Sequence, residues 1–269
     1  MIIDAHTHVW PDKVAHRALS GNGTGFEHFG DGTLTGLRAT MADAGVSRSI
    51  VLGVANNADA VEKVCRFSAS IAGPDVIALG AVHVDLPVDE NVRLIRDNGL
   101  VGIKIHPLYQ GFGLDDPRLV ERLDALDPGM VVMIHVGTGG DGRPVVGSTP
   151  ALMHTLAKAV PHLNVVACHF GGYHQFDEAL EMICGSDVLV DTSWPPSLAA
   201  LDPQRVRDFI RRHGADKVVF ASDWPTADPG HEIQAIRDLG LASDETDHVL
   251  GINMAGILAP IEALIARRI

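Results

Sequence analysis

The chain has 269 residues, of which 46% are hydrophobic and 20% are charged, and its mean hydropathy is +0.15. This balance supplies enough apolar surface for a buried core and excludes a chain that is disordered throughout. The formal net charge of −13 argues against a nucleic acid or an anionic membrane as the main partner, because both favour basic patches. No run approaches the roughly 18–20 uninterrupted apolar residues of a membrane span, and the amino-terminal residues lack a signal-peptide pattern. Three cysteines form no CxxC pair, so we expect a reduced, cytoplasmic protein.

Eight short runs rich in Val, Ile and Ala alternate with amphipathic stretches along the chain. Several runs are apolar on both faces, which is typical of parallel strands covered on both sides. They span residues 2–5, 50–54, 76–82, 100–105, 131–136, 164–169, 187–191 and 217–222. Eight strand–helix units in roughly 250 residues are the size of a (β/α)8 TIM barrel. A doubly wound open sheet has similar content, and periodicity alone leaves it open.

The predicted helices between these runs have recognisable ends. Asp116, Thr149 and Asp202 each precede a proline, the arrangement of an N-cap residue before Pro at the first helical position. Gly45 and Gly99 follow two amphipathic stretches, as C-terminal caps do.

No linker or internal repeat divides the chain, so we predict one domain over residues 1–269. The one long irregular stretch near the start is residues 11–32. It is predicted to be a loop, and it could cover a site as a flap.

Ionisable side chains stand out at the ends of the predicted strands, which are otherwise apolar. His6 and His8 are two residues apart in the first strand and therefore point to the same face. The other strand-end groups are Lys104 and His106 in the fourth strand, His135 in the fifth, His169 in the sixth and Asp223 in the eighth. Because the carboxyl ends of barrel strands meet at one face, three imidazoles and a carboxylate there would make a Zn²⁺ site with room for a water.

Each of these residues also has an ordinary explanation when it is taken alone. His6 and His8 could lie on the surface, His135 could be a core histidine bonded to a carbonyl, and Asp223 could cap the next helix. The placement of all of them at the same end of several strands favours the metal site.

Several segments resemble, in order along the whole chain, the amidohydrolase superfamily of metal-dependent barrel enzymes. They are DAHTH (residues 4–8), GIKIHP (102–107), IH (134–135), CHFGG (168–172), SDWP (222–225) and NMAGIL (253–258). GIKIHP and SDWP are most similar to the amidohydrolase-related branch. That branch includes 2-amino-3-carboxymuconate-6-semialdehyde decarboxylase-like enzymes and lactone hydrolases.

The resemblance implies that His6, His8, His135 and Asp223 bind one divalent metal and that His169 lies close to it. The histidine-rich set suggests Zn²⁺, although Mn²⁺, Fe²⁺ or Co²⁺ would fit the same ligands.

Lys104 has two interpretations under the same resemblance. In superfamily members with two metals, the fourth-strand lysine is carbamylated and bridges the ions, with His135 and His169 then on the second ion. We favour one metal, in which case Lys104 is a cation facing a substrate carboxylate or phosphate. His106, which shares the inward face of Lys104, is a candidate for contact with the substrate.

A bound Zn²⁺ lowers the pKa of its water to roughly 7 and polarises an acyl oxygen. Asp223 could take the proton of that water, and His169 could stabilise an oxyanion or shuttle a proton. We therefore expect a metal-dependent hydrolase of a small organic acid, ester, lactone or amide. A non-oxidative decarboxylase on the same metal site is the alternative, and a metal-binding barrel without catalysis ranks below both. A homo-oligomer is possible, because barrels of this size often pair through exposed helices.

The substrate pocket has a weaker signature. All the tryptophans and tyrosines follow predicted strands on the presumed catalytic side: Trp10, Tyr109, Tyr173, Trp194 and Trp224. Aromatic side chains with polar tips suit a flat or partly apolar ligand, although each could equally seal a loop against the barrel. Arg143 is a candidate carboxylate clamp. Cys168 precedes the inward-facing His169 and is therefore predicted to point toward the helices.

Overall fold

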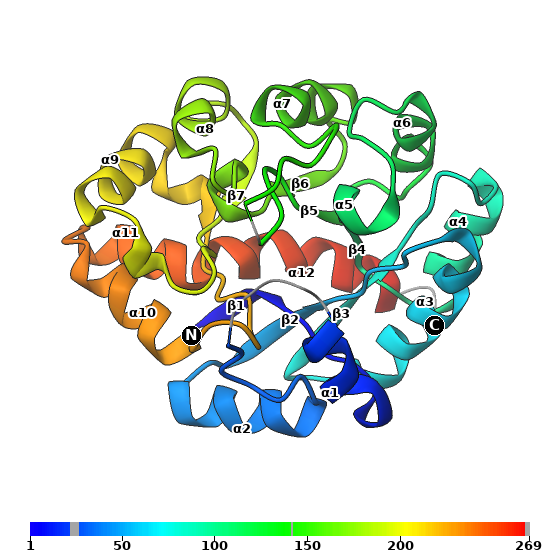
Figure 1. Cartoon of the computed structure of the whole chain (residues 1–269), viewed down its shortest axis with the longest axis horizontal. Coiled ribbons are helices and arrows are strands. Elements are labelled where there is room, and N and C mark those ends of the chain that lie inside the picture. Colours follow the sequence, from blue (N-terminus) through cyan, green and yellow to red (C-terminus); the bar gives the residue numbers. More distant parts are fainter. Residues whose placement is uncertain (22–26, 141, 267–269) are drawn as a thin grey trace.

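Eight parallel strands form one sheet in the order β1 to β8, with helices around its outside (Figure 1). The structure is a computed structural model that describes residues 1–21, 27–140 and 142–266. The strands are β1 (Ile3–Thr7), β2 (Arg48–Leu52), β3 (Val76–Ala81), β4 (Gly102–Ile105), β5 (Val131–Ile134), β6 (Asn164–Ala167), β7 (Leu189–Asp191) and β8 (Val218–Val219). Strands of this kind are buried on both faces, as every residue of β5 shows, and this explains their continuous apolar runs.

The helices alternate with these strands and cover their outer face. The α-helices are α1 (Asp12–Gly21), α2 (Leu34–Ala44), α3 (Val61–Ile71), α4 (Val88–Asp97), α5 (Pro107–Gln110), α6 (Pro117–Asp124), α7 (Pro150–Ala159), α8 (Phe176–Met182), α9 (Pro203–His213), α10 (Pro229–Asp238), α11 (Ser243–Asp247) and α12 (Asn253–Ala266). Short 3-10 turns are η1 (Ala58–Ala60), η2 (His169–Gly171), η3 (Leu198–Ala200) and η4 (Ala215–Lys217), and a π-helical turn, η5 (His248–Ile252), joins α11 to α12.

Backbone hydrogen bonds between β1 and the segment that begins with β8 close the sheet into a barrel. The Ala5 N–H donates to the Phe220 carbonyl at 2.9 Å, and the His8 N–H donates to the Trp224 carbonyl at 2.7 Å. Thr7 and Trp224 form a parallel bridge. The (β/α)8 barrel is therefore confirmed over the open sheet.

The predicted helix caps are confirmed. The side chains of Asp116, Thr149 and Asp202 accept hydrogen bonds from the first turns of α6, α7 and α9, each of which has Pro at its start. Gly45 ends α2 in the left-handed conformation, and Gly99 adopts the same conformation just after α4, where an L side chain would be strained.

The region predicted as an irregular loop contains a helix, so that prediction was wrong in this part. α1 begins directly after Pro11, whose carbonyl accepts from the Ala15 N–H at 3.1 Å. Ala15 is buried, so a short amphipathic face is enough to fix the helix. Residues 22–26 of the expected flap lie outside the described residues.

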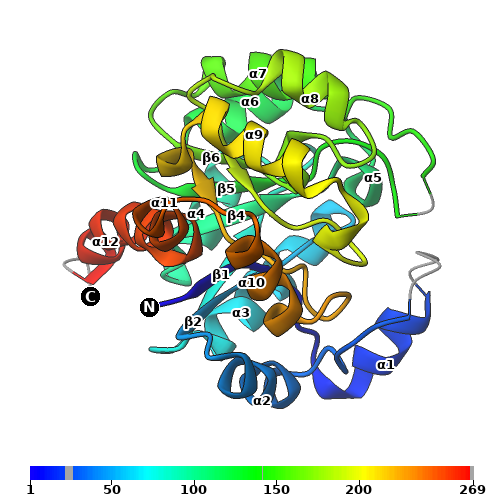
Figure 2. The ribbon, with the colours of Figure 1, turned by 90° about the vertical axis from the view of Figure 1, so that its left-hand side faces the viewer.

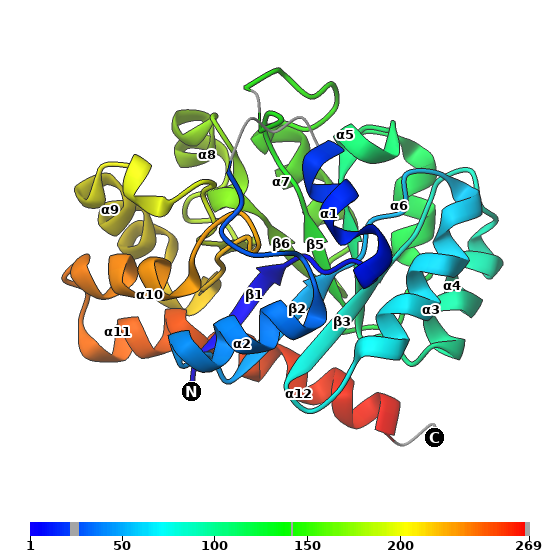
Figure 3. The same cartoon turned by 60° about the horizontal axis from the view of Figure 1, so that its bottom comes forward.

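The C-terminal helices close one end of the barrel. Figures 2 and 3 place α12 across this end, while α1 and α5 lie at the other end. The run Ser243–Ala266 is long and apolar enough to cross a membrane by length and composition, a property shared with core helices of soluble proteins. Here its side chains Val249, Leu250, Met254, Leu258 and Ile261 are buried in the core beside β1 and β8, as in such a core helix.

We predict that replacing Gly102 destabilises the barrel where β4 meets β5. A Cβ atom at Gly102 would overlap the backbone carbonyl of Val131, so Gly102→Ala should lower the free energy of unfolding by about 1–3 kcal/mol. Gly256, exposed within α12, has no atom near the same position. Gly256→Ala should therefore raise the free energy of unfolding by up to about 1 kcal/mol. Denaturant titration of both variants checks the opposite signs.

Candidate metal centre

Side chains from β1 and from the segment after β8 meet at the carboxyl end of the barrel. The Nε2 atoms of His6 and His8 lie 3.1 Å apart. Each of these nitrogens lies 3.4 Å from the Asp223 carboxylate. The structure therefore brings together His6, His8 and Asp223, as the sequence predicts.

A second pair of imidazoles lies beside this group. His135 follows β5 and His169 follows β6, and the His135 Nδ1 lies 3.0 Å from the His169 Nε2. The ring centroid of His169 is 5.2 Å from that of His6. Donor atoms of His6, His169 and Asp223 lie within 4.8 Å of one another, which is close enough to hold a single ion.

Hydrogen bonds to carbonyl oxygens determine which nitrogen of His8 and of His135 carries a proton. The His8 Nδ1 lies 3.1 Å from the Leu52 carbonyl, and the His135 Nε2 lies 2.8 Å from the Thr138 carbonyl. A carbonyl oxygen only accepts, so these ring nitrogens are the donors. In a neutral imidazole the other nitrogen is then unprotonated, and these nitrogens are the His8 Nε2 and the His135 Nδ1, the atoms that face His6 and His169.

The buried imidazoles are neutral. Burial lowers the pKa of His6, His135 and His169 well below the ordinary value, and nearby charged groups such as Lys104 add to this effect. Burial opposes ionisation of Asp223, but neighbouring groups, among them the Lys104 cation, outweigh it and lower the pKa of that carboxyl. Neutral imidazoles and an ionised carboxylate are the protonation states that a divalent metal requires of its ligands.

Backbone strain marks the same positions. Among the non-glycine residues of the described chain, positive φ angles occur at His169 (60°), Phe170 (53°), His174 (56°) and Asp223 (63°). Such conformations are uncommon for non-glycine residues and cluster at functional sites. Two of the four are the proposed catalytic residues His169 and Asp223.

Lys104 is fully buried next to His6. Its Nζ lies 3.4 Å from the His6 Nε2 and donates to the Cys168 Sγ at 3.1 Å. The prediction that Cys168 points toward the helices was wrong, because the left-handed backbone at His169 breaks the alternation of a regular strand. Burial raises the pKa of the Cys168 thiol well above its usual range, so it is a neutral partner for the lysine and a poor nucleophile.

Stacked rings line the mouth above the histidines. The ring of Trp10 stacks on that of His8, with centroids 6.0 Å apart. The His106 ring lies parallel to that of His135, with centroids 4.1 Å apart, and the Tyr109 ring is tilted by 39° against His106 at 4.2 Å. The sequence-based candidates Trp10, Tyr109 and His106 therefore form one cluster of neighbouring rings with the histidines, which we call the ring stack.

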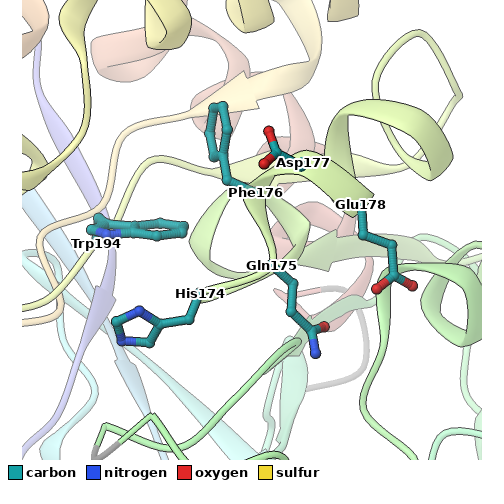
Figure 4. A pocket seen from close by; sticks show the side chains of 6 residues that line it. All are labelled: His174, Gln175, Phe176, Asp177, Glu178 and Trp194. Atoms are coloured by element: carbon teal, nitrogen blue, oxygen red, sulfur yellow. The ribbon is translucent and has the colours of Figure 1, made fainter.

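The remaining candidates differ in position. Tyr173 lies 5.1 Å from the His169 ring, but its hydroxyl donates to the Pro195 carbonyl at 2.7 Å, so only its ring faces the site. Trp194 lines an open hollow of about 300 Å³ beside Tyr173 (Figure 4). Trp224 is fully buried against Gly30. Arg143 is exposed in the loop after β5. The hollow is lined by His174, Gln175, Phe176, Asp177, Glu178 and Trp194.

Sequence reasoning missed Asp191, at the end of β7. It is fully buried and accepts from the His6 Nδ1 at 2.9 Å. A carboxylate that ends the apolar run 188–191 was the signal that could have revealed it. Asp4 was also overlooked as a support: it accepts from the Ser222 N–H and hydroxyl at 3.0 and 2.5 Å, and burial raises its pKa to about 7.

Comparison with solved structures agrees with the fold. A TIM-barrel protein of Bordetella bronchiseptica is 18% identical, with a TM-score of 0.76 over 97% of this chain and 99% of that one. A 5-carboxyvanillate decarboxylase of Sphingomonas paucimobilis is 17% identical, with a TM-score of 0.69 over 96% and 98%. A Pseudomonas putida protein assigned as a 2-pyrone-4,6-dicarboxylic acid hydrolase is 17% identical, with a TM-score of 0.65 over 96% and 97%.

No curated protein matches this chain. A family model does match it: the model described as amidohydrolase covers residues 3–253, which includes every strand of the barrel and all the histidines of the metal centre. The chain belongs to the amidohydrolase family.

Proposed function

We propose that this protein is a metal-dependent hydrolase of a small, flat, unsaturated organic acid or of its lactone, ester or amide. The observation that carries the proposal is the set of unprotonated imidazole nitrogens that face one another beside the Asp223 carboxylate. Members of the amidohydrolase family generally use a divalent metal, and donor atoms of His6, His169 and Asp223 lie within 4.8 Å of one another, close enough to hold one.

The ligands we propose for a single divalent ion are His6, His8, His135 and Asp223. A divalent ion bound there acts as a Lewis acid on an acyl oxygen and makes water a nucleophile at neutral pH. Zn²⁺ is our choice because the donors are mostly imidazole, and Mn²⁺, Fe²⁺ or Co²⁺ fit the same donors. We propose that Lys104, whose Nζ lies 3.4 Å from the His6 Nε2 and donates to the Cys168 Sγ, stays an unmodified cation beside a single ion.

The protein groups then move the protons. Asp223, ionised at neutral pH because of its lowered pKa, accepts a proton from the attacking water. The His169 Nε2 faces the same space and, as a neutral imidazole, can accept that proton and deliver it to the leaving group. Both residues are held by their strained backbone, so their side chains are placed before substrate arrives.

The aromatic rings around the mouth favour a planar substrate. Trp10, Tyr109, Tyr173 and Trp194 present aromatic rings around the mouth, which suits a flat conjugated ligand. We propose Lys104, His106 and Arg143 as the polar groups that meet its carboxylate or carbonyl oxygens. Trp224, buried at the base of the loop, would support these rings from behind.

Decarboxylation on the same site is the second candidate function. Similar folds include 5-carboxyvanillate decarboxylase and 2,6-dihydroxybenzoate decarboxylase, which act on flat carboxylic acids. The same ring stack would hold such an acid, with His169 delivering a proton to carbon. We further propose a cytoplasmic enzyme whose partner is a small molecule and not a nucleic acid or a membrane, supported by the net charge of −13.

The metal ligands can be tested by binding. The purified protein should contain one equivalent of divalent metal, and His8→Ala should weaken Zn²⁺ binding by more than about 100-fold, because loss of a direct ligand exceeds the effect of losing an outer hydrogen bond. Competition with a chelator measures the affinity. His231→Ala, at a side chain that is 86% exposed on α10, is the matched control and should bind as the parent does. Equal binding by both variants would contradict the proposed ligand set.

Asp223→Asn tests the proton acceptor. We expect kcat to fall by about 10²–10⁴-fold at saturating metal, while the thermal midpoint stays within a few degrees of the parent. Asp187→Asn, at a fully exposed carboxylate, controls for the loss of charge. Full activity of Asp223→Asn would rule out this mechanism.

The reaction type can be read from the products. We expect metal-loaded enzyme, given a panel of flat unsaturated lactones, esters and aromatic acids in H₂¹⁸O, to place one ¹⁸O atom in the new carboxylate of a lactone or ester and to release no CO₂ from the acids. Release of CO₂ without ¹⁸O uptake would establish the decarboxylase instead. Neither signal, from enzyme that binds metal, would refute both.

A further inference from the structure

Asp191 and Ser193 occupy alternate positions at the end of β7, and both side chains are fully buried beneath the histidines. Between them, Thr192 bonds instead to the backbone of Ala221 after β8, accepting from its N–H at 3.0 Å. The two-residue spacing therefore points Asp191 and Ser193 into the barrel and Thr192 toward its neighbouring strand.

One carboxylate connects two of the histidines. The Asp191 Oδ2 accepts from the His6 Nδ1 at 2.9 Å. Its Oδ1 accepts from the His169 backbone N–H at 2.8 Å, from the Ser193 backbone N–H at 3.1 Å and from the Ser193 hydroxyl at 2.7 Å. Because both oxygens only accept, the His6 Nδ1 must carry its proton and the His6 Nε2 is left unprotonated.

Ser193 fixes the position of the proton on His169 in the same way. Its hydroxyl proton is given to Asp191, so the Ser193 Oγ can only accept, and the His169 Nδ1 lies 2.9 Å away. The His6 Nδ1 is farther from this oxygen, at 3.3 Å, and has its shorter contact with Asp191. The Ser193 carbonyl, 3.3 Å from the His169 Nδ1, also only accepts. The His169 Nδ1 therefore carries the proton, and the His169 Nε2 faces the site as an acceptor.

We propose that Asp191, with Ser193 as its relay, is a positioning residue that fixes the tautomers of both His6 and His169. Asp191 acts on His6 and thus on metal affinity, whereas Ser193 acts on His169 and thus on proton transfer. The second half of the proposal rests on the hydrolytic function proposed above, and the first half stands without it.

Asp191→Asn tests the effect of Asp191 on the His6 tautomer, because it keeps the shape of the side chain and replaces one acceptor oxygen by a donor. In this variant the amide oxygen accepts from the donors of His169 and Ser193, and the amide NH₂ therefore faces the His6 Nδ1. Because the NH₂ group only donates, the His6 Nδ1 must become the acceptor and its proton must move to Nε2. We expect ¹⁵N NMR of histidine-labelled, metal-free protein to show this move, and Zn²⁺ affinity to fall by about 10–100-fold. Assignment of the His6 signals uses their loss in His6→Gln.

Ser193→Ala and Thr192→Val complete the test. Ser193→Ala should keep the Zn²⁺ affinity within twofold and lower kcat by about 10–100-fold with little change in KM. Thr192→Val removes buried hydrogen bonds of the same strand and should lower stability without moving the His6 proton. The proposal is overturned if Asp191→Asn leaves the His6 tautomer and the affinity unchanged, or if Thr192→Val weakens Zn²⁺ binding as strongly. The NMR and binding measurements need no substrate, so they hold even if the proposed reaction proves wrong.

Discussion

Imidazole nitrogens without protons face one another in the mouth of this barrel, at 3.1 Å between His6 and His8 and at 3.0 Å between His135 and His169. Two lone pairs at this separation repel, and a positive charge between them removes the repulsion. A proton is a poor source of that charge, because burial lowers the pKa of His6, His135 and His169. A divalent cation held by His6, His8 and His135, as we propose, would supply it, and the adjoining Asp223 carboxylate would compensate part of its charge.

Backbone carbonyls and a carboxylate, which only accept hydrogen bonds, hold the imidazole rings in this arrangement. The Leu52 carbonyl ends β2, which pairs with β1 and so brings it to His8, whereas the Thr138 carbonyl lies in the loop after β5, three residues beyond His135. The Asp191 carboxylate holds His6 from β7. Closure of the sheet is therefore a condition of the chemistry, because His6 and His8 on β1 depend on acceptors from β7 and β2.

The sequence predicts the barrel and most of its metal centre because both follow from local patterns. Apolar runs and capped helices are set within a few residues, and the spacing of His6 and His8 is a direct consequence of strand geometry. The direction of Cys168 depends instead on the left-handed backbone at His169 (φ 60°), which no propensity of a histidine predicts. The sequence does not identify Asp191 as part of the site, because a single carboxylate at a strand end is also typical of a helix cap or a surface residue. Only its contact with His6 across the barrel distinguishes it.

The two halves of the site have different structural origins. The groups that would hold the ion are buried or half-buried and lie at the strand ends, whereas the rings of Tyr109, Tyr173 and Trp194 follow β4, β6 and β7 in loops. Hydrolysis and decarboxylation can both use the buried half, since each needs a Lewis acid and a residue that moves a proton. The choice between them depends on which bond of the substrate lies over Asp223 and His169, and the loops control this orientation. We therefore infer that the aromatic rings on the loops select the reaction type, whereas the groups at the strand ends would hold the ion and move the proton.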